Sequence, residues 1–172
     1  MKYYARIASS LLLVCTAVAV LLAAIHLATR DQIAANTLRA RQEAIAALYP
    51  AFSSMREESE GHPEGVHTVY TVEGVDGLLG YAVELASRGF GGDVQMIVGL
   101  GTDGAVCGVR ILSHSETPGL GSRALEEGYL SAFHGMTAGG EIDGISGATF
   151  SSRAVQNGVA LALSLGLGGE AA

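Results

Sequence analysis

The sequence has no tryptophan, few other aromatic residues and no lysine beyond Lys2. Residues 31–172 contain seven Arg and all 17 acidic residues, which gives this part of the chain a formal charge of −10. A nucleic-acid-binding surface needs clustered Lys and Arg for phosphate contacts, and aromatic side chains on which bases stack. The composition therefore disfavours a nucleic-acid partner.

Cysteine is also scarce. Cys15 lies in an apolar run and Cys107 in the polar part of the chain, so we predict no disulfide between them. Two thiolates cannot hold a four-thiolate iron–sulfur cluster. His62, His67 and His134 are not spaced as metal ligands, and we predict no metal site.

Charge is absent from Ile7 to Thr29, a run of 23 residues. As a helix the run would extend about 34 Å, which exceeds the ~30 Å hydrocarbon layer of a bilayer. A cleaved signal peptide has a shorter apolar core, and a lipoprotein signal ending at Cys15 would need a small residue in place of Val14. We therefore predict a retained transmembrane helix within residues 1–30.

The charges beside this run leave its orientation open. Lys2 and Arg6 precede it, whereas Arg30, Arg39 and Arg41 follow it. The positive-inside rule gives nearly equal weight to the two sides, and a large C-terminal domain can be translocated largely regardless of its charge.

The chain beyond the run divides into two further parts. Apolar residues recur near helical spacing from Asp31 to Leu48, and Pro50 ends the pattern, which predicts a helical stalk over residues 31–50. Residues 51–172 should form a separate domain. Its first stretch, Ser53–Gly65, carries four acidic residues and a proline, which indicates a surface loop.

Within this domain the pattern predicts an α+β fold. All 24 Gly follow residue 30, and Asp103-Gly104 is a hairpin signal. The expected strands, joined by short links as an antiparallel meander, are Val66–Glu73, Leu78–Ala86, Val94–Leu100 and Ala105–Leu112. The expected helices, packed with the sheet, are Arg123–Phe133 and Ser151–Leu165.

A loop of small residues, Asp143–Thr149, precedes the last expected helix. Free N–H groups at a helix N-terminus favour a phosphate, and Gly144 and Gly147 allow close backbone approach. An ordinary helix cap, in which Ser and Thr are also preferred, explains the same residues. Physical reasoning alone leaves both interpretations open.

This segment resembles the flavin-attachment motif of the FMN-binding domain family and matches it at every position. The resemblance implies that Thr149 carries FMN, joined covalently through a phosphoester. It also implies that a separate flavin transferase installs the FMN from FAD and recognises Asp143. The other cofactor-binding residues that it implies are Gly144, Ser146, Gly147 and Ala148.

A second motif, Ser113–Gly121, follows the last expected strand. By its composition it is a turn, in which His114 and Glu116 could also form an acid–base pair. Its run Glu-Thr-Pro-Gly-Leu-Gly resembles the signature of the G subunit of the Rnf electron-transport complex. A related run occurs in the C subunit of the sodium-pumping NADH:quinone reductase. The residues that this resemblance places beside the flavin are Glu116, Thr117, Leu120 and Gly121.

The resemblance implies a membrane-anchored electron carrier of an Rnf-type complex, which couples electron flow between ferredoxin and NAD to ion movement. It implies a single-pass protein of the cell (inner) membrane, with an extracytoplasmic FMN-binding domain over residues 51–172. Other membrane and iron–sulfur subunits would be its partners. The alternatives are the quinone-reductase subunit, which is usually longer, a membrane-bound FMN-domain redox sensor, and an anchored domain whose motif only caps a helix.

Overall fold

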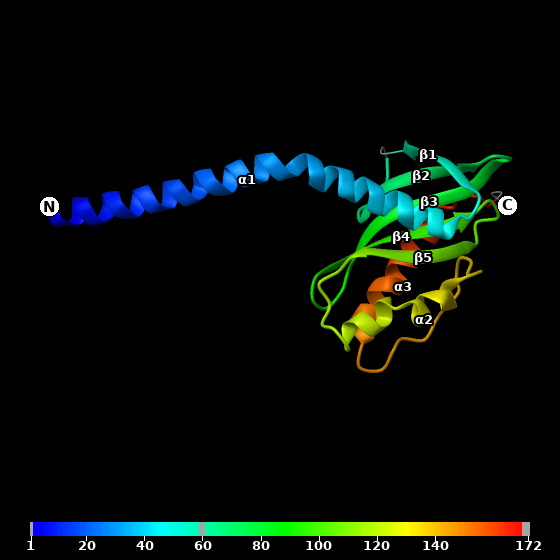
Figure 1. The fold of residues 1–172 in the computed structure, drawn as a ribbon. Coiled ribbons are helices and arrows are strands. Elements are labelled where there is room, and N and C mark those ends of the chain that lie inside the picture. The colour runs from blue at the N-terminus through cyan, green and yellow to red at the C-terminus, as the bar shows by residue number, and fades with distance from the viewer. Residues whose placement is uncertain (1, 59–60, 170–172) are drawn as a thin grey trace. The chain divides into compact units, whose positions relative to one another are not determined.

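A computed structural model describes residues 2–58 and 61–169 of the chain. The chain, drawn as a ribbon in Figure 1, divides into two compact units between Ala40 and Arg41.

The first unit is helical. It belongs to α1 (Lys2–Leu48), a continuous helix that runs on into the second unit. By length and composition this helix can cross a membrane. Hydroxyls along it, including those of Ser9, Ser10 and Thr29, donate to carbonyls of the preceding turn, as suits a helix surrounded by lipid. The helical pattern predicted from Asp31 to Leu48 is confirmed.

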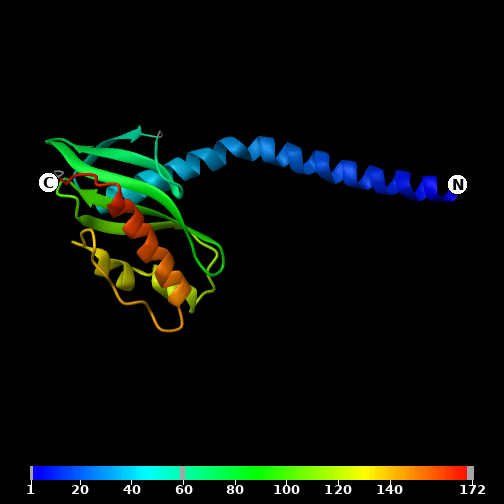
Figure 2. The same cartoon turned by 180° about the vertical axis from the view of Figure 1, so that it is seen from behind.

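The second unit contains a five-stranded sheet. Its strands follow one another in chain order and every neighbouring pair is antiparallel, as Figures 1 and 2 show. They are β1 (Phe52–Glu58), β2 (Val66–Gly74), β3 (Gly77–Arg88), β4 (Asp93–Gly101) and β5 (Val106–Ser113). The predicted meander and the α+β class are confirmed.

Strand β1 corrects the prediction of a loop over Ser53–Gly65. Its sequence is polar on both faces, and only Phe52 and Met55 are even partly buried. Such a segment has no alternating pattern to detect, because its one neighbour is β2 and its side chains face water. Its strand conformation depends on the backbone ladder with β2.

Both faces of the sheet are covered. Helix α3 (Thr149–Ser164) packs on one face, where Val155 and Val159 join Met96 and Val98 in a core (Figure 2). A side chain at Gly158 would meet Met96 and Leu85, so its absence permits the close approach of helix and sheet. Because both faces are buried, β4 is an almost continuous apolar run.

The opposite face receives the last turns of α1. Ile45 and Tyr49 pack there with Tyr70, Val72 and Ile97. The Tyr49 hydroxyl lies 2.7 Å from the carbonyl oxygen of Tyr81 and 2.9 Å from that of Leu100. Burial is the main cause that raises the pKa of Tyr49, so this hydroxyl remains a donor.

A buried carboxylate also lies on this face. Arg41 Nη2 donates to Glu84 Oε1 at 2.8 Å, Arg41 Nε lies 2.8 Å from Oε2, and the Tyr70 hydroxyl donates to Oε2 at 3.0 Å. The hydrogen bond to Glu84 raises the pKa of Arg41. Burial, followed by the Glu84 charge, raises the pKa of Tyr70 to about 12. This cluster joins α1 to β2 and β3.

The prediction of one continuous helix over Arg123–Phe133 is wrong. The segment forms a 3₁₀ turn η1 (Gly121–Leu125), a single turn α2 (Glu127–Leu130) and a second 3₁₀ turn η2 (Ser131–Phe133). Glu126 is extended between the first two. Phe133 and Leu130 are buried in the main core, so burial of these side chains outweighs helical propensity.

Candidate functional site

The two sequence motifs meet at one pocket of about 230 Å³ in the second unit. Three segments that are distant in the sequence line it: the link between β3 and β4, the loop after β5, and the start of α3. Its lining residues are Phe90, Glu116, Thr117, Leu120, Gly121, Gly147, Ala148, Thr149, Phe150 and Ser151. The antiparallel meander brings the ends of β3 and β5 to the same end of the sheet.

Glu116 is the buried charged residue of this pocket, with 5% of its surface exposed. Its Oε1 accepts hydrogen bonds from Phe90 N at 2.8 Å and Gly91 N at 3.1 Å. Its Oε2 accepts one from Ser151 Oγ at 2.7 Å. The backbone N–H of Glu116 itself donates to His114 Nδ1 at 3.2 Å. The carboxylate is thus bound to the protein on both oxygens.

The loop after Glu116 is held by its own hydrogen bonds. The backbone N–H groups of Leu120 and Ser122 both donate to the Thr117 carbonyl, and Gly119 N donates to Ser122 Oγ at 2.9 Å. This closed turn presents Leu120 outward with 59% of its surface exposed. A large exposed apolar side chain at a pocket is available to pack on a ligand.

At the start of α3 the first backbone N–H groups have no hydrogen-bond partner among the residues that the structure describes. Ala148 is the N-cap residue and supplies no side-chain cap, so the first N–H groups of the helix are open to an anion. Gly147 precedes it with a φ of +83°, a conformation that glycine adopts without strain. Thr149 is the first helical residue and is exposed.

The four hydroxyls around this helix start differ in accessibility. Ser151 Oγ donates to Glu116, and Ser152 Oγ accepts from Ile145 N at 2.9 Å; both residues are buried. Ser146 and Thr149 are exposed. Among the described residues, no hydrogen bond involves the Thr149 hydroxyl, which leaves it accessible for reaction.

A second pocket of about 280 Å³ adjoins the first through Thr149. Gly144 and Ser146 of the first motif line it, together with Ile145, Arg153 and Gln156. Asp143 is exposed and lines neither pocket. The predicted residues therefore fall into three groups: those in the first pocket, those in the second, and Asp143 outside both.

Sequence reasoning missed Phe90 and Phe150. Phe90 and Phe150 are 73% and 62% exposed, and their ring centroids lie 6.0 Å apart at the pocket. A signal was present for Phe90, since a lone aromatic residue between Gly89 and Gly91 has no strand pattern to satisfy. Phe150 directly follows the last residue of the attachment motif.

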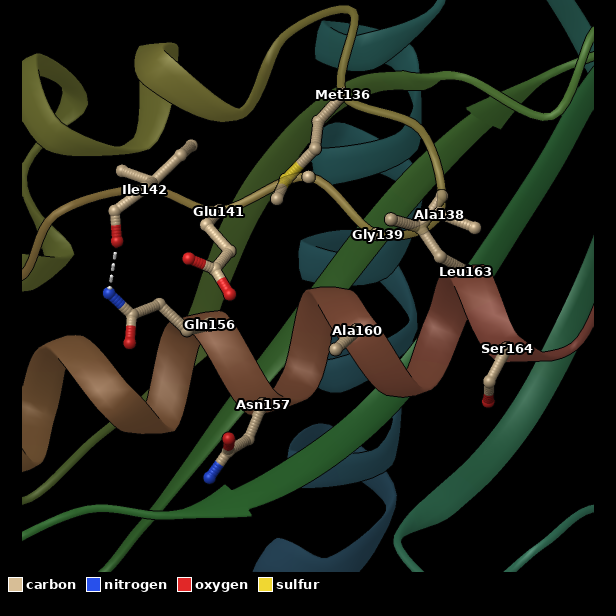
Figure 3. Close-up of a pocket in the computed structure, with 11 residues that line it drawn as sticks. Met136, Ala138, Gly139, Glu141, Ile142, Gln156, Asn157, Ala160, Leu163 and Ser164 are labelled. Atoms are coloured by element: carbon tan, nitrogen blue, oxygen red, sulfur yellow. Dashed lines mark hydrogen bonds between the residues drawn. The ribbon is translucent and has the colours of Figure 1, made fainter.

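A larger pocket of about 580 Å³ lies between α3 and the loop before the first motif. In Figure 3 Gln156 donates from its Nε2 to the Ile142 carbonyl oxygen, at 2.7 Å, and Met136 and Leu163 line other parts of the pocket. Its lining includes none of the residues that the motifs single out. We place the functional site at the smaller pocket, where both motifs converge.

Known proteins resemble this chain over most of its length. Residues 89–164 match the FMN-binding domain family, a segment that contains both motifs. The G subunit of the ion-translocating oxidoreductase complex of Haemophilus influenzae (strain PittEE) is 32% identical over 168 residues, covering 84% of this chain and 80% of the relative. The chain belongs to the family of G subunits of ion-translocating oxidoreductase complexes. The family predicted from the motifs is confirmed.

Other members of this family match over different lengths. The relative from Methanosarcina acetivorans is 29% identical over 168 residues, which covers 90% of this chain and 89% of that protein. The relative from Shewanella piezotolerans is 37% identical over 102 residues, which covers 51% and 48%. The H. influenzae and M. acetivorans matches extend well beyond the segment that carries the two motifs.

Proposed function

We propose that this chain is the FMN-carrying, membrane-anchored subunit of an Rnf-type complex and relays electrons through FMN bound at the pocket. The proposal rests on one observation. A single pocket contains Thr149, at the uncapped start of α3, and an apolar rim formed by the exposed side chains of Phe90, Leu120 and Phe150. FMN supplies the electron-accepting and electron-donating chemistry, and the protein supplies position and electrostatics.

The residues present suit the two ends of FMN. Open N–H groups at the start of α3 suit the phosphate. The exposed side chains of Phe90, Leu120 and Phe150 suit a flat, largely apolar ring system. The polar atoms available beside the rim are those of Thr117 and the turn that follows it.

We further propose that the flavin is joined to Thr149 covalently. The Thr149 oxygen would form a phosphoester bond with the FMN phosphorus of FAD, while the pyrophosphate bond breaks and AMP leaves with the displaced oxygen. The hydroxyl proton is lost to solvent. A flavin transferase would catalyse this step and recognise Asp143, whose exposed position outside both pockets leaves it free for such contact.

Substitutions of the hydroxyls test the attachment site. In chain produced together with the transferase and exported, Thr149→Ala should abolish covalent flavin, and Thr149→Ser should retain part of it. Ser146→Ala is the matched control, because Ser146 is the other exposed hydroxyl of the motif; it should lower loading without removing the acceptor. Denaturing-gel fluorescence and peptide mass would locate FMN less one water. An adduct mapped to Ser146, or fluorescence persisting in Thr149→Ala, would refute the assignment.

The domain division proposed with this function is an anchor over residues 1–30, a stalk over 31–50 and the FMN-binding domain over 51–172. The apolar helix α1 supports a single membrane span, and family resemblance favours an extracytoplasmic flavin domain. An exposed Ser53→Cys should react with an impermeant thiol reagent in intact cells, in a Cys107→Ala background. Tyr3→Cys, before the span, should react only after lysis. The opposite pattern would reverse the topology.

Membership of a complex predicts its own biochemical result. After mild extraction, this chain should copurify with other membrane and iron–sulfur subunits. The purified complex should transfer electrons between ferredoxin and NAD. Purification with sodium-pumping quinone-reductase subunits would favour that alternative. Purification alone, with flavin attached, would favour a redox sensor.

A further inference from the structure

The Glu116 carboxylate connects three backbone segments that form the pocket wall. Its hydrogen bonds reach Phe90 N and Gly91 N in the link between β3 and β4, and Ser151 Oγ in the first turn of α3. The residue itself belongs to the loop after β5. Since it is only 5% exposed, losing the carboxylate would leave two N–H groups and a hydroxyl without their partner.

The surrounding backbone is packed closely against this carboxylate. A Cβ atom added at Gly89 would collide with Glu116 Oε1, and one added at Gly121 would collide with Glu116 Oε2 and approach Ser151 Oγ to 2.6 Å. At Gly91 a Cβ atom would collide with the Ser115 carbonyl oxygen. The three glycines therefore allow the segments to converge on one side chain.

The bonded groups belong to functional parts of the pocket. Phe90, bonded through its own N–H, supplies part of the exposed rim. Ser151 lies two residues after Thr149 in the first turn of α3. One carboxylate thus restrains both the rim that faces the ring and the turn that carries the acceptor hydroxyl.

We propose that Glu116 is a positioning residue that forms the pocket before flavin is attached, through its hydrogen bonds rather than through its charge. Its consequence for loading at Thr149 rests on the proposed function. The hydrogen bonds themselves belong to the chain without flavin and can be tested there.

Two conservative variants separate the effect of side-chain length from the effect of charge. Glu116→Gln removes the charge but keeps a carbonyl oxygen for the two N–H groups and an amide that can donate to Ser151 Oγ. Glu116→Asp keeps the charge but shortens the side chain by one methylene, so it cannot reach all three donors. Glu64→Ala, at an exposed residue outside the pocket, changes the net charge by one and is the control.

Amide hydrogen exchange of the full-length, flavin-free chain in detergent gives the direct readout. In Glu116→Asp the amides of Phe90 and Gly91 should exchange about tenfold faster or more, as expected when a hydrogen bond is lost. Glu116→Gln and Glu64→Ala should exchange at the wild-type rate. Wild-type exchange in Glu116→Asp, or fast exchange in Glu116→Gln, would overturn the proposal.

Covalent loading gives the second readout, in the same variants produced with the transferase. Glu116→Asp should carry several-fold less flavin than wild type, whereas Glu116→Gln should load normally. Normal loading of Glu116→Asp despite fast exchange would overturn the link between the hydrogen bonds and attachment. If the proposed attachment itself is wrong, wild type will carry no flavin on Thr149, while the exchange result still decides the positioning role.

Discussion

Two buried glutamates, on different parts of the second unit, have opposite surroundings. Glu84 on β3 binds the Arg41 guanidinium and the Tyr70 hydroxyl. Glu116, after β5, binds two backbone N–H groups and the Ser151 hydroxyl, all of them neutral. Both residues are 5% exposed. Equal burial therefore does not imply an equal role.

The two buried carboxylates are stabilised by different features of their surroundings. Glu84 depends on the charge of Arg41, because a buried carboxylate that loses its cation becomes strongly unfavourable. Glu116 depends on the number and direction of its donors, which a neutral acceptor of the same shape can also satisfy. We expect substitutions that remove a charge to destabilise the α1 side of the sheet. Substitutions that change the length or volume of a side chain should instead disturb the pocket.

The largest effect is expected at Arg41. Arg41→Met leaves the Glu84 charge buried with Tyr70 as its remaining donor, and should lower the free energy of unfolding by about 3 kcal/mol. Flavin loading at Thr149 should be unchanged. Urea unfolding of the full chain in detergent measures the loss. The double variant Arg41→Met/Glu84→Leu should recover much of the lost free energy of unfolding. A double variant less stable than Arg41→Met alone would contradict the pairing of the two residues.

A comparable but smaller effect is expected from crowding Glu116. In Gly121→Ala the new Cβ atom would displace the Glu116 carboxylate and Ser151 Oγ, at a cost of about 2 kcal/mol for overpacking. Covalent flavin should fall. Gly128→Ala is the control, because no atom lies within 4 Å of a Cβ added there; it should load normally. Equal loading of the two variants would disprove the crowding argument.

The same substitution at the two glutamates sharpens the contrast. Glu84→Gln should cost about 1–2 kcal/mol, because Arg41 loses its counterion but stays partly exposed to water. Glu116→Gln should change stability by less than about 1 kcal/mol, since the two N–H groups keep an acceptor and the new amide donates to Ser151 Oγ. Chemical unfolding of both variants gives the comparison. A larger loss in Glu116→Gln would reverse the proposed dependence on charge.

The last effect concerns Tyr70, and its pH-dependent part appears only at high pH. Because the folded chain raises the pKa of Tyr70 from 10 to about 12, it holds this proton more tightly than the unfolded chain does. The resulting stability is fully present below pH 10 and is lost as the pH rises to about 12. Tyr70→Phe should lose about 1 kcal/mol at neutral pH and show a shallower decline between pH 10 and 12. Identical declines for both proteins would contradict it.

Much of the fold follows from local patterns. The apolar run, the alternation in β2 and the Asp103-Gly104 turn predicted α1 and the meander. Strand β1 escaped prediction because its polar residues carry no alternating signal. The continuous helix over Arg123–Phe133 was wrong because the burial of Phe133 and Leu130 breaks the segment into short turns.

The sequence by itself determined the chemistry available to this protein: an apolar helix, a small-residue motif ending in Thr149, and a glycine-rich loop around Glu116. Only the tertiary structure decided that the two motifs share one pocket and that Phe90 and Phe150 also line it. It also distinguished the exposed Thr149 hydroxyl from the buried one of Ser151. Motif residues are local in the chain, whereas burial and hydrogen-bond partners depend on segments that only the folded sheet brings together.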